Sequence, residues 1–281
     1  MSTPAWLIRY RRFRSRVRRL KNHFGKPQAA NQIRKRTDFT RCEKPVLLIY
    51  GFMATRRSLQ VMERRLRRDG YCVFSLNLGG LRGAFNNRPV EELAAHVAAK
   101  VERMYARYKL GPLTIIGHSK GGLIGAHYVK HLGGHRRVRT LITLGTPHNG
   151  TPFAYLGLLI APVAQSVLEM MPLSPFIRRL KKTPTPRSVW FASIWSQEDA
   201  VCPFPAAVVD RGLPNVKNVE VHAPHHDLLL RKHVYDAVHA ELANGAAWAL
   251  AHPRIKEENV AVPQEAERRV PEIDGTLGLP V

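Results

Sequence analysis

Short apolar runs alternate with longer helical segments through the middle of this chain. The runs are rich in Val, Ile and Leu, as expected of buried strands. They occupy residues 45–50, 71–76, 113–116, 138–144, 188–195 and 216–222. Predicted helices over residues 56–68, 90–109 and 121–129 lie between them. Strands that alternate with helices in this way predict an α/β fold with a doubly wound, mostly parallel sheet.

The N-terminal segment follows a different pattern. Between residues 6 and 24, an aromatic or aliphatic residue recurs every three or four positions, which forms one stripe along an α-helix. The stripe consists of Trp6, Tyr10, Phe13, Val17, Leu20 and Phe24. Residues 1–37 also contain twelve Lys and Arg and no acidic residue, which is about half of the net charge of +23.

Two interpretations of this basic helix stand side by side. Its stripe lies on an anionic membrane surface, or it packs on the rest of the chain and leaves the arginines in solvent. Nucleic-acid binding is disfavoured, because no recognised nucleic-acid motif accompanies the stripe. The sequence thus predicts a basic arm over residues 1–43, an α/β domain over residues 44–252 and an irregular tail over residues 253–281, which carry four prolines.

Composition and the missing leader features bear on the compartment. Three cysteines (Cys42, Cys72 and Cys202) are too few for a disulfide framework and fit a reducing environment. The N-terminal segment lacks the apolar core of a secretory signal, and no apolar run is long enough for a transmembrane helix. We therefore expect a cytoplasmic protein, or one that is peripheral on the inner face of a membrane. The sequence does not fix its oligomeric state.

The sequence GHSKG at residues 117–121 lies between the predicted strand 113–116 and the predicted helix 121–129. A serine on such a sharp strand-to-helix turn is held in a strained backbone with its hydroxyl exposed. The pentapeptide is short enough to arise by chance, so its place between a strand and a helix gives it weight. Ser119 is therefore the candidate nucleophile.

A serine hydroxyl needs an imidazole base, and that base needs a carboxylate to set its tautomer. Asp199 follows the predicted strand 188–195, and His225 and His226 follow the last predicted strand. Catalytic loops lie at the carboxyl ends of parallel strands, so these residues are suitably placed. Glu198 is the weaker acid candidate, since we interpret it as a solvated loop charge.

Four blocks together resemble the bacterial lipases and esterases of the α/β-hydrolase superfamily, in particular the triacylglycerol lipase group, over about residues 44–245. They are IYGF at 49–52, GHSKGGL at 117–123, LGTPHNGT at 144–151, and the acid and histidine loops. The resemblance implies that Ser119 is the nucleophile, Asp199 the orienting acid, and either His225 or His226 the base.

The choice between the two histidines stays open, with a preference for His225. These lipases often carry His-x-x-Leu-Leu and a Val nine residues after the histidine, which fits His225 through Val234. From His226, the ninth position is a tyrosine. Counting forward from the predicted strand end at Val221 favours His226 instead.

The resemblance also implies an oxyanion hole made of the backbone N–H groups of Phe52 and Lys120. Two residues depart from the family pattern. Tyr50 stands where a histidine is usual, and Lys120 where Met, Leu or Gln is usual. The Lys120 side chain either faces the cleft, where it would favour an anionic group, or lies on the surface at the start of a helix.

Residues 152–186 fall where α/β-hydrolases insert their caps. They are apolar and Met-rich, and then basic from Arg178 to Lys182. This composition indicates a lid over an acyl pocket, with a basic flank suited to phospholipid, or else ordinary core packing by cap helices.

The resemblance implies hydrolysis of lipid-type carboxylic esters through an acyl-enzyme, without a metal or organic cofactor. His222, His225 and His226 are close in sequence but lack metal-ligand spacing. Acyl transfer or thioester hydrolysis by the same residues is the alternative reaction. A membrane-associated protein that keeps the fold without turnover is the alternative of another class.

Overall fold

The computed structural model describes residue 31 and residues 37–80, 85–155, 165–209 and 212–253. The predicted amphipathic helix over residues 6–24 and residues 254–281 of the predicted tail lie outside these residues. Within them, no helix is both long and apolar enough to cross a membrane.

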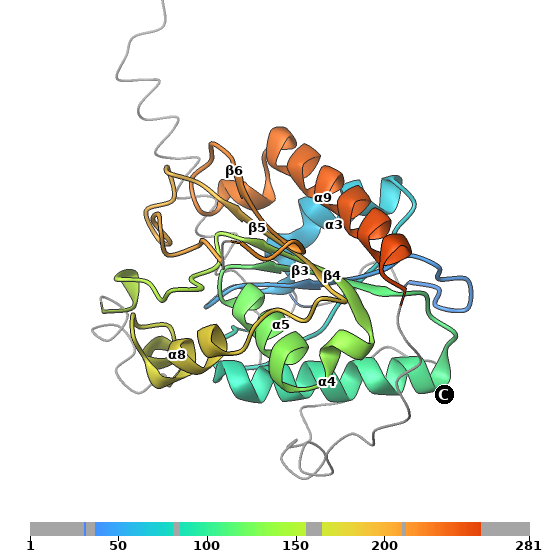
Figure 1. Ribbon diagram of the computed structural model, residues 1–281, viewed down its shortest axis with the longest axis horizontal. Helices are drawn as coiled ribbons and strands as arrows, with labels where there is room; N and C mark the ends of the chain where they lie inside the picture. The colour runs from blue at the N-terminus through green and yellow to red at the C-terminus, as the bar shows by residue number, and fades with distance from the viewer. Residues whose placement is uncertain (1–30, 32–36, 81–84, 156–164, 210–211, 254–281) are drawn as a thin grey trace, which may run out of the picture.

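The described residues form one sheet of parallel strands in the order β2-β1-β3-β4-β5-β6 (Figure 1). The strands are β1 (Pro45–Ile49), β2 (Cys72–Ser75), β3 (Leu113–His118), β4 (Val138–Leu144), β5 (Trp190–Trp195) and β6 (Val216–Glu220). Five of the predicted apolar runs contain one strand each, and the sixth, over residues 113–116, covers the first part of β3, which continues to His118. The prediction of a doubly wound parallel sheet is therefore confirmed.

Helices cover both faces of the sheet (Figure 1). On one face lie α4 (Val90–Arg107) and α5 (Lys120–His131), and on the other lie α3 (Gln60–Arg68) and α9 (Lys232–Ala251). Shorter helices are η1 (Arg56–Leu59), η2 (Gly134–Arg136), α7 (Gln165–Glu169), α8 (Pro175–Lys182) and η3 (Asp227–Leu229). Parallel neighbours need such crossover helices, because a tight turn cannot join two strands that run in the same direction.

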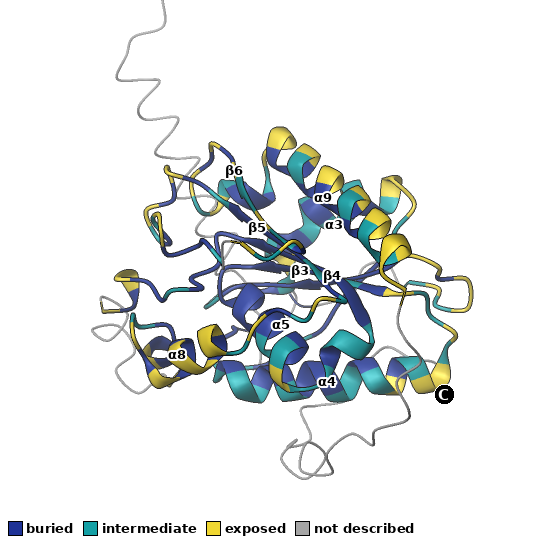
Figure 2. Cartoon of the chain, viewed as in Figure 1, coloured by how far each residue is buried: buried dark blue, intermediate teal, exposed yellow. Residues whose placement is uncertain are grey.

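The core follows from the apolar pattern. β1 and β4 are buried along their whole length, whereas the edge strand β6 is largely half-buried or exposed (Figure 2). In α4, buried apolar residues recur at helical spacing: Leu93, Val97, Val101 and Met104. Strands covered on both faces are apolar throughout, which explains why their positions are readable from sequence.

The strand order predicts a crevice at the point where successive strands are added to opposite sides of β1. From β1 the chain adds β2 on one side and then returns to add β3 on the other side. Crossovers that lead away from each other leave an opening at the carboxyl ends of β1 and β3. The loop after β1 and the GHSKG turn after β3 therefore lie side by side at this opening.

The predicted cap divides into two populations of apolar side chains. Six of them belong to the main hydrophobic core: Ala154, Val167, Met170, Phe176, Ile177 and Leu180. Four others are exposed: Phe153, Tyr155, Leu168 and Leu173. Much of this segment is thus core packing, as one of the two interpretations held, while residues 156–164 lie outside the described part of the chain.

Candidate active site

Ser119 lies between the last residue of β3 and the first residue of α5, with φ 54° and ψ −127°. Positive φ is strained for a residue with a side chain, and it persists only where the surroundings enforce it. Here the N–H of Ser119 donates to the carbonyl of Leu144 at 2.8 Å, and the hydroxyl of Thr146 donates to the Ser119 carbonyl at 2.9 Å. The turn is therefore fixed from the end of β4.

The glycines around Ser119 leave room for this turn. A methyl group at Gly121 would lie 2.2 Å from the carbonyl oxygen of Ile49, and one at Gly117 would lie 2.5 Å from Cα of Gly122. Both distances are too short for any side chain, so the helix and strands approach closely only with glycine at these positions.

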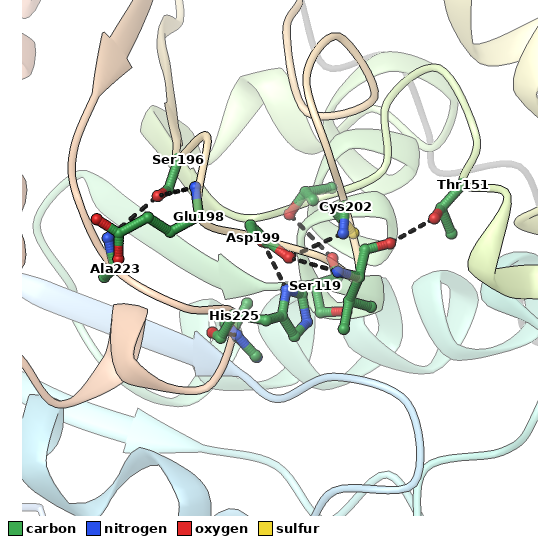
Figure 3. A network of polar contacts seen from close by, with 11 residues as sticks. Ser119, Thr151, Ser196, Glu198, Asp199, Cys202, Ala223 and His225 are labelled. Atoms are coloured by element: carbon green, nitrogen blue, oxygen red, sulfur yellow. Dashed lines mark hydrogen bonds and ion pairs between the residues drawn. The ribbon is translucent and has the colours of Figure 1, made fainter.

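Asp199 is fully buried in the loop after β5. Its Oδ1 accepts the backbone N–H groups of Val201 at 2.9 Å and Cys202 at 2.8 Å. Its Oδ2 lies 2.7 Å from Nδ1 of His225, in the loop after β6 (Figure 3). A carboxylate at Nδ1 favours the tautomer with the proton there, which leaves Nε2 of His225 free to accept a proton.

His118 supports the histidine loop from below. Its Nε2 lies 3.0 Å from the backbone carbonyl of His225, and the two rings are 4.7 Å apart. Burial, together with the nearby His225, holds the pKa of His118 well below its usual 6.5. His118 is therefore neutral, and its Nε2–H donates to the carbonyl of His225.

Gly145 brings the serine and the acid–base pair to one place. It directly follows Leu144, whose carbonyl holds the N–H of Ser119, and its φ is +52°. A methyl group there would lie 2.6 Å from Oδ2 of Asp199 and 3.1 Å from Nδ1 of His225. The loops after β3, β4, β5 and β6 thus converge around this glycine, as Figure 3 shows for Ser119, Asp199 and His225.

The rest of the LGTPHNGT block braces the loop that carries Asp199. The side-chain amide of Asn149 donates to the carbonyls of Pro205 and Val208 at 2.8 and 2.9 Å. The hydroxyl of Thr151 donates to the carbonyl of Val201 (Figure 3). The side chains of this block therefore support the acid loop through hydrogen bonds to its backbone carbonyls.

Ser196 is a supporting residue that the sequence analysis missed. Its buried hydroxyl oxygen accepts the N–H groups of Glu198 and Ala223, both at 3.1 Å, and so joins the acid loop to the histidine loop (Figure 3). Its position at the end of the predicted strand 188–195 was the available signal.

Two candidates lie outside the buried pair. The side chain of Glu198 is half exposed, and its carboxylate lies 3.8 Å from Nδ1 of the exposed His222. His226 is exposed, with its ring 6.4 Å from that of His118. Of the two candidate histidines, it is His225 that holds the contact with Asp199.

Neither expectation for the Lys120 side chain is correct. It lies neither in the cleft nor on the surface but is fully buried, with Nζ donating to Oδ1 of Asn86 at 2.8 Å and to the carbonyl of Arg88. Burial lowers the pKa of Lys120 to about 7. No signal in the sequence pointed to Asn86, because it lies in a segment without helical or strand periodicity.

The loop after β1 lies directly against Ser119. A methyl group at Gly51 would lie 2.9 Å from Cβ of Ser119. Phe52 directly follows Gly51, and Lys120 directly follows Ser119, so the two residues expected to form the oxyanion hole are each next to a residue of this contact. This is the arrangement that the proposed oxyanion hole requires.

The described residues contain one group with possible metal ligands, formed by Asp199, Cys202 and His225, whose ligand atoms lie within 4.8 Å of one another. Asp199 and His225 bind each other. Burial holds the pKa of Cys202 well above its usual 9.0, which keeps it a neutral thiol and a poor ligand. The donor set therefore fits an acid–base pair better than a metal.

Comparisons with known proteins agree with this fold. The α/β hydrolase fold family matches residues 44–179. A lipase from Bacillus licheniformis superposes with a TM-score of 0.57 at 15% identity, over 75% of this chain and 96% of that chain. Lipase B from Aspergillus fumigatus gives 0.59 at 17%, over 88% of this chain and 62% of that one.

A third solved structure, from a study of carboxylesterases of the thaumarchaeon Nitrososphaera gargenis, gives a TM-score of 0.54 at 16% identity, over 75% of this chain and 93% of that chain. At these identities the likeness is one of fold.

Proposed function

This chain has the α/β-hydrolase fold, and we propose that it is a serine hydrolase that cleaves carboxylic esters of lipid type. The observation that carries the proposal is the 2.7 Å contact between buried Asp199 and His225, beside the strained turn of Ser119. Structural relatives named as lipases and carboxylesterases support the ester as the bond that is cleaved.

In the proposed reaction, Oγ of Ser119 attacks the ester carbonyl while Nε2 of His225 accepts its proton. Asp199 holds Nδ1–H and stabilises the imidazolium that forms. The N–H groups of Phe52 and Lys120 receive the negative charge of the tetrahedral intermediate. His225 then protonates the departing alcohol, and the same base activates the water that releases the acid from Ser119.

Two features support a lipid-type substrate. Phe153 and Tyr155 expose about half of their surface two and four residues after Thr151, which bonds to the acid loop. Large exposed apolar side chains near a site favour an apolar ligand. The basic arm, with its apolar stripe over residues 6–24, would in this proposal hold the enzyme at an anionic membrane surface.

The test compares wild type with Ser119→Ala on p-nitrophenyl esters from acetate to palmitate, with and without anionic vesicles. Loss of the nucleophile is expected to lower kcat by at least about 10⁴-fold. Ser188→Ala, in the half-buried turn before β5, is the control and is expected to retain activity. A preference for long chains and stimulation by vesicles are the expected signs of a lipid enzyme.

A fluorophosphonate probe separates the outcomes. Labelling at Ser119 without ester turnover would move acyl transfer ahead of hydrolysis. Absence of labelling in folded wild type would contradict serine chemistry altogether.

A further inference from the structure

Asn86 fastens the loop that follows β1. Its side-chain Nδ2 donates to the carbonyl of Tyr50 at 2.9 Å, and its backbone N–H donates to the carbonyl of Ala54 at 3.2 Å. The N–H of Met53 in turn donates to the carbonyl of Asn86 at 2.9 Å. Asn86 is fully buried, so these bonds hold both sides of Phe52 without competition from water.

The fourth hydrogen bond of Asn86 reaches the other side of the proposed oxyanion hole. Its Oδ1 accepts Nζ of Lys120 at 2.8 Å, and the carbonyl of Arg88 accepts Nζ as well. The backbone N–H of Lys120 is one proposed oxyanion donor, and the N–H of Phe52 is the other. One buried side chain therefore links the segments that carry the two donors.

A buried lysine at this position costs folding free energy. Burial of a charged ammonium is strongly unfavourable, and an apolar side chain could fill the same volume. The compensation is partial: two neutral oxygens, the ring of Phe52 with its centroid 5.7 Å from Nζ, and the attraction of Glu169 in α7. A function in holding Asn86 explains why a buried lysine occupies the position.

We propose that the side chains of Lys120 and Asn86 are positioning residues that hold the N–H groups of Phe52 and Lys120 at the spacing needed to bind an oxyanion. This inference rests on the proposed serine hydrolase function and adds two residues that act through others. Neither side chain is expected to touch the substrate.

The link is also sensitive to pH. Burial lowers the pKa of Lys120 to about 7, against the opposing attraction of Glu169. Arg88, which contributes its carbonyl, directs its guanidinium to Glu92 of α4 instead. A protonated lysine forms a charge-assisted bond to Asn86, whereas the neutral amine forms a weaker one. The two N–H donors of the oxyanion hole are thus expected to be held in place more strongly below pH 7 than above it.

The test uses the full chain with Lys120→Met, which keeps length without charge. At pH 6, kcat on a p-nitrophenyl ester is expected to fall by about 10- to 100-fold with KM nearly unchanged, since a misplaced donor weakens the transition state more than the ground state. The Kd of a trifluoromethyl ketone, whose adduct with Ser119 places an oxyanion in the hole, is expected to rise by a similar factor.

The pH profile distinguishes positioning from a merely structural role. The ratio of wild-type to variant kcat is expected to be largest at low pH and to decrease as the pH rises through about 7. Lys130→Met, in the same helix and half-buried, is the matched control and is expected to leave both kcat and the profile unchanged. If Lys120→Met fails to fold, Asn86→Ala and the wild-type profile provide the same comparison.

Failure of the inference differs from failure of the proposed function. A folded Lys120→Met enzyme with kcat and ketone affinity within about twofold of wild type would overturn the inference alone. Wild type that is not labelled at Ser119 by a fluorophosphonate would overturn both.

Discussion

Asp199 and Glu198 are adjacent carboxylates in different surroundings. Asp199 is fully buried and accepts hydrogen bonds from two backbone N–H groups and from His225, whereas the side chain of Glu198 is half exposed. His225 and His226 differ in a similar way. At the scale of the residue, the two members of each pair have the same functional group. Burial and hydrogen bonding decide which of them is placed to act in the proposed reaction.

The two histidines provide a matched pair of variants. His225→Gln is expected to lower kcat by about 10⁴-fold or more, because the proton of Ser119 then has no acceptor. His226→Gln changes an exposed side chain and is expected to keep kcat within about twofold. Steady-state kinetics on the same ester gives the answer, and equal losses in the two variants would contradict the assignment of the base.

At the scale of the element, the site is assembled from the carboxyl ends of four neighbouring strands. β4 lies between β3, which precedes Ser119, and β5, which precedes Asp199. Its terminal residue Leu144 binds the N–H of Ser119, and the following Gly145 lies against Asp199 and His225. The end of β4 therefore sets the position of Ser119 relative to Asp199 and His225, although none of these residues belongs to β4.

Gly145→Ala tests this role. Its methyl group would lie 2.6 Å from Oδ2 of Asp199, so we expect the acid and His225 to separate and kcat to fall by about 10²-fold or more. Gly70→Ala is the control, since Gly70 also has positive φ (+86°) but nothing lies within 4 Å of a methyl group there.

Both variants are expected to lose about 1–2 kcal/mol of stability from backbone strain, but only Gly145→Ala should lose activity. Thermal unfolding and kinetics on both proteins check this. An equal effect on kcat would indicate that strain, and not contact with the acid–base pair, explains the loss.

At the scale of the whole molecule, the buried Lys120 couples stability to pH. Its pKa is about 7 in the folded chain, against an ordinary value of 10.5. Between these values the unfolded chain binds a proton that the folded chain does not, so stability rises with pH. Below pH 7 Lys120 is protonated in both the folded and the unfolded chain, so it no longer makes stability depend on pH.

We therefore expect the free energy of unfolding of wild type, relative to Lys120→Met, to increase as the pH rises from about 7 to about 10. Denaturant unfolding at several pH values in this range measures the difference, in which most other titrating groups cancel. A difference that stays constant with pH would show that Lys120 keeps its ordinary pKa.

The sheet and the sharp turn at Ser119 were predictable for physical reasons. Strands covered on both faces are continuous apolar runs. The turn at Ser119 requires glycine at positions 117 and 121, because a side chain there would clash with the backbone. The burial of Lys120 was not predictable, because lysine is ordinarily exposed and its partner Asn86 lies 34 residues away in a loop without periodicity. His225 and His226 were only partly separable, because the spacing to Val234 favoured His225 and the distance from the predicted strand end at Val221 favoured His226.

The chain order of the site also has a consequence for biosynthesis. Ser119 and the strands β1 to β4 precede Asp199 and His225, which follow β5 and β6 near the end of the described chain. Because domains begin to fold from the N-terminal side during translation, a nascent chain holds the serine well before it acquires the acid and the base. Under the proposed function, a nascent chain that has not yet added β6 lacks the base and is expected to be inert toward esters.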